Sequence, residues 1–142
     1  MAHKHERTYA RRTAVQVLYL LDVRNQTEFK RTPTELIDLK ELDVVEGEMD
    51  DYAMKLIEGV WKHKDDIDSQ LDSLANNWAI ERMPIVDKNV LRVSAFELMH
   101  VDDVPVSVSI DEAVEIAKGF CGEESPKFIN GILGSLADKL EE

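Results

Sequence analysis

Four polar residues near the N-terminus have the types and spacing of a nucleic-acid-binding helix face. Thr8, Arg12, Gln16 and Tyr19 stand at i, i+4, i+8 and i+11. At about 100° per residue they gather on one side of a helix. An arginine fork binds phosphate, a glutamine amide pairs with a base edge, and a tyrosine ring stacks on a base. The same spacing also fits a solvated face that holds one half-buried tyrosine, and spacing alone leaves both interpretations open.

A second candidate lies near the C-terminus, where Lys127 and Phe128 follow Ser125 and Pro126. Serine followed by proline is typical of a helix start, with serine as the N-cap and proline in the first turn. The apolar stripe of this predicted helix begins at Ile129, and Phe128 lies about 100° away from it. A cation beside an aromatic ring could form a stacking platform for RNA. The alternative is that Phe128 belongs to the core.

The residues that usually support catalysis or metal binding do not form a recognisable pattern. The four histidines lack the spacing of zinc ligands, and no second cysteine accompanies Cys121. Neither G-x-x-x-x-G-K-[ST] nor G-x-G-x-x-G occurs. The adjacent acid pairs are expected at solvated helix ends. We therefore expect a protein that is not an enzyme and that has no cofactor and no metal site.

Charge is distributed unevenly along the chain, whose net charge is −12 at pH 7. Residues 1–31 hold seven Lys and Arg against three acids, a local charge of +4, which leaves −16 for the remainder. Phosphate responds to the local field within roughly 8 Å at physiological salt. The basic end can thus contact RNA, whereas the acidic remainder predicts that affinity needs specific contacts or a partner protein.

Length and composition favour one domain that spans residues 1–142. No apolar run approaches the roughly 18 residues of a membrane span, and the N-terminus lacks the apolar segment of a signal peptide. A single cysteine is typical of a reducing compartment. We expect a cytoplasmic protein with no membrane contact.

Nearly all of the chain is predicted to be helical, because only residues 104–110 alternate as a strand would. That short segment is expected to be an extended connector. Ser109 and Glu112 form a capping box, which predicts a helix start at Ser109. The expected architecture is all-α, with about seven helices in two packed bundles around one core. The expected helices cover residues 8–23, 32–39, 48–62, 65–77 and 86–101, with a final pair that starts at Ser109 and Ser125.

Three segments, in order along the chain, resemble the family of the transcription antitermination factor NusB. They are ARRTAVQVLYLLD (10–22), DKNVLRVSAFELMHVDDVPVSVSIDEA (87–113) and SIDEAVEIAKGFCGEESPKFINGILG (109–134). The resemblance implies the same all-α fold. It also implies that the chain binds boxA-type single-stranded RNA together with NusE, a small-subunit ribosomal protein. Within the RNA polymerase antitermination complex, this binding would support transcription of ribosomal RNA.

The resemblance carries RNA contact over to five residues of the N-terminal segment: Arg7, Arg11, Arg12, Gln16 and Tyr19. This arm has fewer arginines than many relatives. That departure bears on the affinity for RNA, and on its dependence on a partner, more than on the location of the site.

Near the C-terminus the resemblance implies that Lys127 contacts phosphate and that Phe128 stacks on a base. Glu124 matches an acidic position close to the RNA, where it would oppose binding or set the register. Asp87 and Lys88 open the central helix in the region that the family turns toward NusE.

Two other functions are compatible with the same residues. Similar helical domains position RNA at the N-terminus of ribosomal RNA cytosine methyltransferases. A helical bundle of this charge could also be a protein-interaction module that does not bind RNA. The RNA consensus, and the choice between a monomer and a homodimer that hides the RNA face, are left open.

Overall fold

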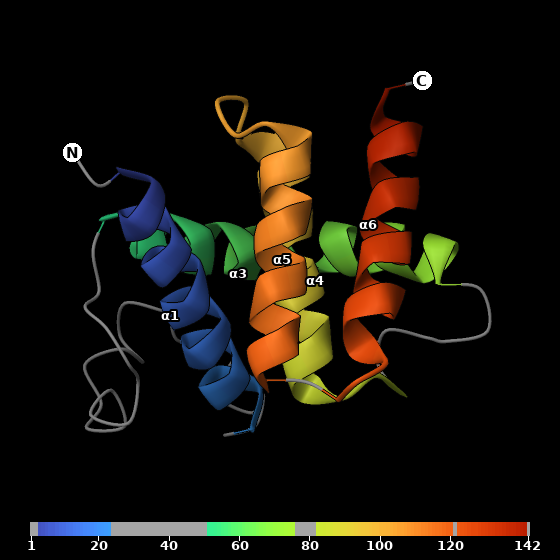
Figure 1. The fold of residues 1–142 in the computed structure, drawn as a ribbon, viewed down its shortest axis with the longest axis horizontal. Helices are drawn as coiled ribbons and strands as arrows, with labels where there is room; N and C mark the ends of the chain where they lie inside the picture. Colours follow the sequence, from blue (N-terminus) through green and yellow to red (C-terminus); the bar gives the residue numbers. More distant parts are fainter. Residues whose placement is uncertain (1–2, 24–50, 76–81, 121, 142) are drawn as a thin grey trace.

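The computed structural model describes residues 3–23, 51–75, 82–120 and 122–141. Within these ranges there are five helices and no strand. Figure 1 shows α1, α5 and α6 side by side, with α3 crossing behind them. The helices are α1 (His3–Val23), α3 (Asp51–Leu74), α4 (Ile85–His100), α5 (Val106–Phe120) and α6 (Ser125–Leu140).

The expected count of about seven helices is wrong, although the all-α class is correct. The two helices expected at 48–62 and 65–77 are one continuous helix, α3. Its charged middle contains neither glycine nor proline, and the buried positions Val60 and Ile67 stand two turns apart on one stripe. Nothing therefore interrupts the helix. The helix expected at 32–39 lies outside the described residues.

The extended connector and the capping box at Ser109 are also corrected. Helix α5 begins at Val106, and the carbonyl of Pro105 accepts hydrogen bonds from the backbone N–H groups of Val108 and Ser109, at 3.0 and 3.1 Å. The hydroxyl of Ser109 donates to Oε1 of Glu97 at 2.7 Å instead of capping a helix. Packing against α4 thus outweighs the strand-like alternation of valines.

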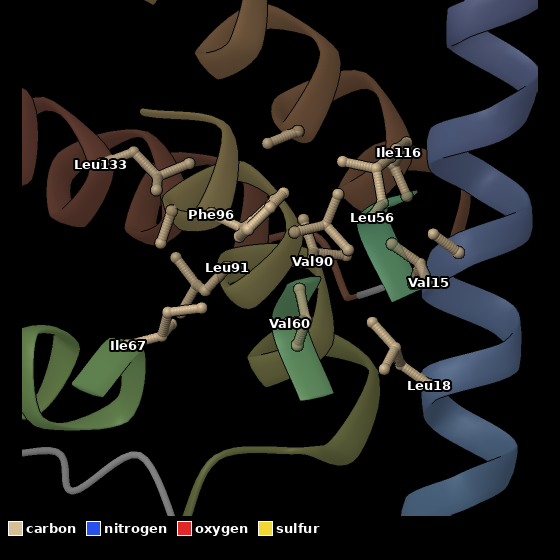
Figure 2. Close-up of a cluster of buried hydrophobic side chains, with 14 of the residues drawn as sticks. Val15, Leu18, Leu56, Val60, Ile67, Val90, Leu91, Phe96, Ile116 and Leu133 are labelled. Carbon is tan, nitrogen blue, oxygen red and sulfur yellow. The ribbon is translucent and has the colours of Figure 1, made fainter. Parts of the chain in front are cut away.

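Helix α4 is the centre of the core, because almost every position from Asp87 to Glu97 is buried. A helix that is buried all round needs neighbours on every side, and α4 packs against each of the other four helices. Figure 2 shows the resulting apolar cluster, to which all five helices contribute. Its labelled members are Val15, Leu18, Leu56, Val60, Ile67, Val90, Leu91, Phe96, Ile116 and Leu133.

A buried arginine on α4 links three helices. The Nε and Nη2 atoms of Arg92 each donate to a carboxylate oxygen of Asp68 at 2.8 Å, and Nη1 donates to Asp22 at 2.8 Å. Asp68 belongs to α3 and Asp22 to α1. Arg92 is 5% exposed, and a buried charge of this kind is tolerated only when it is paired and hydrogen-bonded.

Two glycines provide a matched pair of stability tests. A Cβ at Gly59 would lie 2.2 Å from Cζ of Phe96, whereas a Cβ at Gly134 would meet no atom within 4 Å. Gly59→Ala should lower the free energy of unfolding by about 1–3 kcal/mol through overpacking. Gly134→Ala should raise it by about 0.5–1 kcal/mol, because helical glycine is entropically costly. Urea unfolding measures both, and shifts of the same sign would contradict the packing of α3 on α4.

A pair of stacked histidines predicts an acid-sensitive contact between α3 and α4. The rings of His63 and His100 have centroids 4.3 Å apart, and Phe96 lies 5.3 Å from His100. Burial, and then the charge of His63, lowers the pKa of His100 from its ordinary value of 6.5, while Asp66 opposes the shift. The unfolded chain therefore takes up this proton first, and the free energy of unfolding should fall as the pH drops below about 6.5.

Unfolding measured in urea at pH 8, 7, 6 and 5 tests this prediction. The variant His100→Gln keeps a polar side chain but cannot take up the proton, so it should lose less stability over this range than the unmodified chain. If the variant and the unmodified chain lose the same free energy of unfolding, groups other than His100 cause the acid sensitivity.

Candidate nucleic-acid interface

The polar residues of α1 divide between two sides of the helix. Arg7 and Arg11, one turn apart, point toward the interior. Arg11 is 4% exposed; its Nε donates to Oε2 of Glu97 and its Nη1 to Oε1 of Glu112, both at 2.8 Å. The structure thus places Arg11 inside the molecule, paired with two carboxylates.

Arg7 lies closer to solvent, but it also has partners within the chain. Its Nη2 donates to Oδ2 of Asp103 at 3.1 Å, and its guanidinium lies 4.3 Å from the ring centroid of Tyr52. The hydrogen bond raises the pKa of Arg7, against the effect of burial, and lowers the pKa of Asp103. The side chain of Arg7 is 35% exposed, so a phosphate could reach it by competing with Asp103.

The neighbouring side of α1 presents the other three candidates. Arg12 and Gln16 are half-buried, and Tyr19 is 37% exposed. The guanidinium of Arg12 lies 5.6 Å from the ring centroid of Phe120, at the end of α5. Phe120 is also 37% exposed. This contact therefore adds a second accessible ring to the basic side of α1.

Phe120 was missed by the sequence analysis. It lies at the edge of the apolar stripe of α5, where a ring is equally compatible with the core. The signal that could have identified it is its place as the last residue of α5, just before the turn that leads to Lys127 and Phe128.

At the start of α6, Lys127 and Glu124 are exposed and Phe128 is half-buried against the core. Glu124 occupies the N-cap position that was expected for Ser125. The hydroxyl of Ser125 donates to Oδ2 of Asp87 at 2.7 Å, which joins α6 to the start of α4. Asp87 is 6% exposed.

A pocket of about 300 Å³ opens between the starts of α4 and α6. One side is formed by Phe128 and Glu124, and the other by Asp87 with the segment that precedes α4. The pocket places Asp87, which is expected to contact the protein partner, next to the ring of Phe128, which is expected to contact RNA. The complete lining is Met83, Pro84, Asp87, Glu124, Ser125 and Phe128.

The first turns of α4 also hold the end of α1. Asp22 accepts a hydrogen bond from Nδ2 of Asn89 at 2.8 Å, two residues beyond the contact between Asp87 and Ser125.

In Figure 1 the C-terminal ends of α1 and α5 and the N-terminal end of α6 lie at the same lower edge of the molecule. We give the name aromatic edge to the candidate residues that α1, the end of α5 and the start of α6 contribute. They are Arg12, Gln16, Tyr19, Phe120, Lys127 and Phe128.

Two negative findings apply to the described part of the chain. No three histidine, cysteine or acidic side chains gather closely enough there to hold a metal ion. No helix in those ranges has the length and apolar character needed to cross a membrane.

Accessible aromatic rings beside arginine and lysine, at one end of an all-helical body, are the features of a helical protein that binds nucleic acid. The chain belongs to the NusB family, which it matches over residues 8–138.

Relatives with known names extend over nearly the whole chain. It is 38% identical over 134 residues to the transcription antitermination protein NusB of Rubrobacter xylanophilus, covering 94% of this chain and 91% of that protein. It is 43% identical over 134 residues to NusB of Desulfotalea psychrophila, covering 92% and 94%.

Solved structures agree with this assignment. The fold is similar to that of T. maritima NusB, with a TM-score of 0.78 and 30% identity over 94% of this chain and 91% of that one. It is equally similar, with a TM-score of 0.78 and 28% identity, to a chain in a structure of NusB and NusE with double-stranded RNA, covering 98% and 99%.

Proposed function

We propose that this chain is a transcription antitermination factor that binds boxA-type single-stranded RNA together with NusE. In this role it acts within the RNA polymerase antitermination complex and supports transcription of ribosomal RNA. Membership of the NusB family and the solved complex of NusB and NusE with RNA support this function. The observation that carries it is the aromatic edge, where Tyr19 and Phe120 are accessible rings and Phe120 lies beside the guanidinium of Arg12.

Each residue of the aromatic edge has a distinct role in this proposal. Tyr19 and Phe128 stack on unpaired bases, and Gln16 pairs with a base edge. Arg12, held over the ring of Phe120, and Lys127 at the start of α6 bind phosphates. The N-terminal end of a helix adds its own attraction for an anion near Lys127.

The remaining candidates lie outside the aromatic edge, and Arg7 lies toward the other end of α1. The exposed carboxylate of Glu124 repels phosphate and thereby restricts the register of the RNA. Arg7 adds a phosphate contact when RNA displaces Asp103. Asp87 and Lys88, next to the pocket between α4 and α6, meet NusE, so the partner and the RNA lie close enough to share contacts.

We further propose that the chain works without catalysis and without a cofactor, in the cytoplasm. Its contribution would be positional: it presents RNA and NusE to the transcription complex. The acidic remainder of the chain explains why two proteins share the RNA, since the long-range field of this one disfavours non-specific binding.

A salt-dependent titration tests the function. A fluorescent boxA oligonucleotide is titrated with the chain, alone and with NusE, at several salt concentrations. The logarithm of the affinity should fall with the logarithm of salt, with a slope of about −0.7 for each phosphate contact. NusE should raise the affinity at every salt concentration. Firm binding of NusE without RNA binding in either titration would instead support a protein-interaction module.

A further inference from the structure

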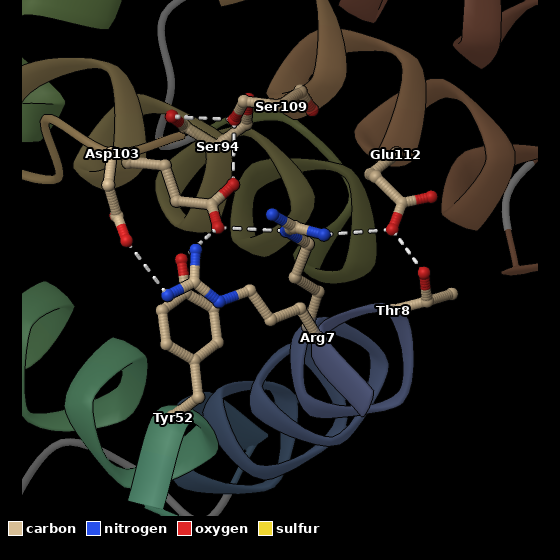
Figure 3. Close-up of polar contacts among 9 residues, drawn as sticks. Arg7, Thr8, Tyr52, Ser94, Asp103, Ser109 and Glu112 are labelled. Carbon is tan, nitrogen blue, oxygen red and sulfur yellow. Dashed lines mark hydrogen bonds and ion pairs between the residues drawn. The ribbon is translucent and has the colours of Figure 1, made fainter. Parts of the chain in front are cut away.

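A buried carboxylate on α4 receives hydrogen bonds from three other helices. Glu97 is 1% exposed. Its Oε2 accepts from Nε of Arg11 at 2.8 Å and from the hydroxyl of Tyr52 at 2.5 Å, while its Oε1 accepts from Ser109 at 2.7 Å. These donors belong to α1, α3 and α5, and Figure 3 shows Tyr52 and Ser109 converging from different helices.

The hydroxyl of Tyr52 keeps the proton that it donates to Glu97. Burial, and then the bond to Glu97, raises the pKa of the Tyr52 hydroxyl far above its ordinary value of 10. Tyr52 therefore remains a donor at every physiological pH. The carboxylate of Glu97 thus has three donors within the protein.

A second carboxylate, that of Glu112, adds a direct link between α1 and α5. Oε1 of Glu112 accepts from Nη1 of Arg11 at 2.8 Å and also from the hydroxyl of Thr8. Figure 3 shows Thr8 and Glu112 facing each other across the gap between the two helices. Two residues of α1, almost one turn apart, are thus bound to one residue of α5.

The apolar contacts of α1 are less directional than these polar ones. Its buried face includes larger side chains such as Val15 and Leu18. This apolar stripe sets the side of α1 that faces the core, but apolar burial depends on area and tolerates small changes of rotation. A rotation of α1 would move the guanidinium of Arg11 away from Glu97 and Glu112. The polar cluster therefore narrows the rotation that the apolar stripe allows, because Arg11 must reach both carboxylates.

We propose that Arg11, Glu97 and Glu112 form a positioning cluster that fixes the rotation of α1 against α5. Arg12 then lies over Phe120, and Tyr19 reaches the aromatic edge. These residues act through α1 and do not touch RNA. The proposal rests on the proposed function, because its measurable consequence is RNA affinity.

The main test removes both buried charges together. In Arg11→Met/Glu97→Met, the arginine and the fully buried carboxylate are removed together, and exchanges of a whole buried pair are often neutral for stability. Glu112 loses its cation, but its side chain is 15% exposed and still accepts from the hydroxyl of Thr8. The variant should unfold cooperatively and bind NusE as the unmodified chain does. Its boxA affinity should fall roughly 5- to 150-fold, the loss expected for one misplaced stacking ring. A folded variant with unchanged boxA affinity would show that the cluster is only structural.

Two further variants complete the experiment. Ser94→Ala removes a hydroxyl that bonds only within the α4–α5 part of the cluster, at 2.9 Å from the Ser109 hydroxyl, so its boxA affinity should not change. Glu112→Ala removes the acceptor on α5 that Arg11 and Thr8 share, leaves Arg11 paired with Glu97, and serves if the double variant does not fold. Its boxA affinity should fall roughly threefold, the loss of one modest hydrogen bond, with NusE binding retained.

Unchanged boxA affinity in Glu112→Ala overturns the proposal. Absence of RNA binding by the unmodified chain would instead overturn the proposed function, so the two failures are distinguishable.

Discussion

Replacing Arg92 with methionine should lower the free energy of unfolding by about 3–5 kcal/mol. Methionine fills much of the same space, so the loss comes from the carboxylates that remain. Asp68 loses both arms of the guanidinium fork, and Asp22 loses a donor at 2.8 Å. Lys64, 3.8 Å from Asp22, still stays close to it.

This prediction has a matched control on the surface. Lys118 pairs with Glu115 at 2.9 Å, but their side chains are 59% and 64% exposed. Lys118→Met should therefore change the free energy of unfolding by no more than about 0.5 kcal/mol. Urea unfolding at pH 7 measures both variants. A loss below about 1 kcal/mol for Arg92→Met would contradict the conclusion that this network joins α1, α3 and α4.

The second large effect concerns RNA. Tyr19→Ala and Phe128→Leu should each weaken boxA binding by about 1–3 kcal/mol, because each removes one stacking surface. Leucine is chosen at position 128 because the ring also packs against the core, and an aliphatic side chain keeps part of that contact. Binding is measured by titration in the presence of NusE.

The conservative variant Tyr19→Phe separates stacking from hydrogen bonding. It keeps the ring and should retain boxA affinity, whereas Tyr19→Ala loses it. Unfolding curves confirm that each variant is folded at the temperature of the titration. Unchanged affinity in both Tyr19→Ala and Phe128→Leu would reject the aromatic edge as the RNA-binding surface.

The all-α class follows from patterns within single segments of the sequence. The predictions that are wrong concern helix boundaries that depend on contacts between residues far apart in the sequence. Residues 62–65 are all charged or histidine, so the sequence offers a plausible break. No glycine or proline interrupts this charged segment, and the packing of Val60 and Ile67 on one stripe keeps α3 continuous. Ser109 with Glu112 satisfies the capping pattern, yet Ser109 bonds to Glu97, which a local pattern does not identify.

The sequence likewise predicts the part of the candidate site that depends on spacing within one helix. Spacing indicates that Arg12, Gln16 and Tyr19 share a side of α1. The same spacing places Arg11 on the apolar stripe, three residues before Ala14 and seven before Leu18. It does not identify the carboxylates that pair with Arg11, because they are 86 and 101 residues away along the chain. The stacking of Arg12 on Phe120 likewise depends on how α1 and α5 pack.

Photo-crosslinking tests the location of the RNA directly. A boxA oligonucleotide that carries 5-iodouracil at each uridine is bound to the chain with NusE, irradiated and mapped by mass spectrometry. Crosslinks should form at the accessible rings of the aromatic edge, namely Tyr19, Phe120 and Phe128. Crosslinks confined to the α3–α4 side, at Trp61 or His100, would contradict the proposed interface.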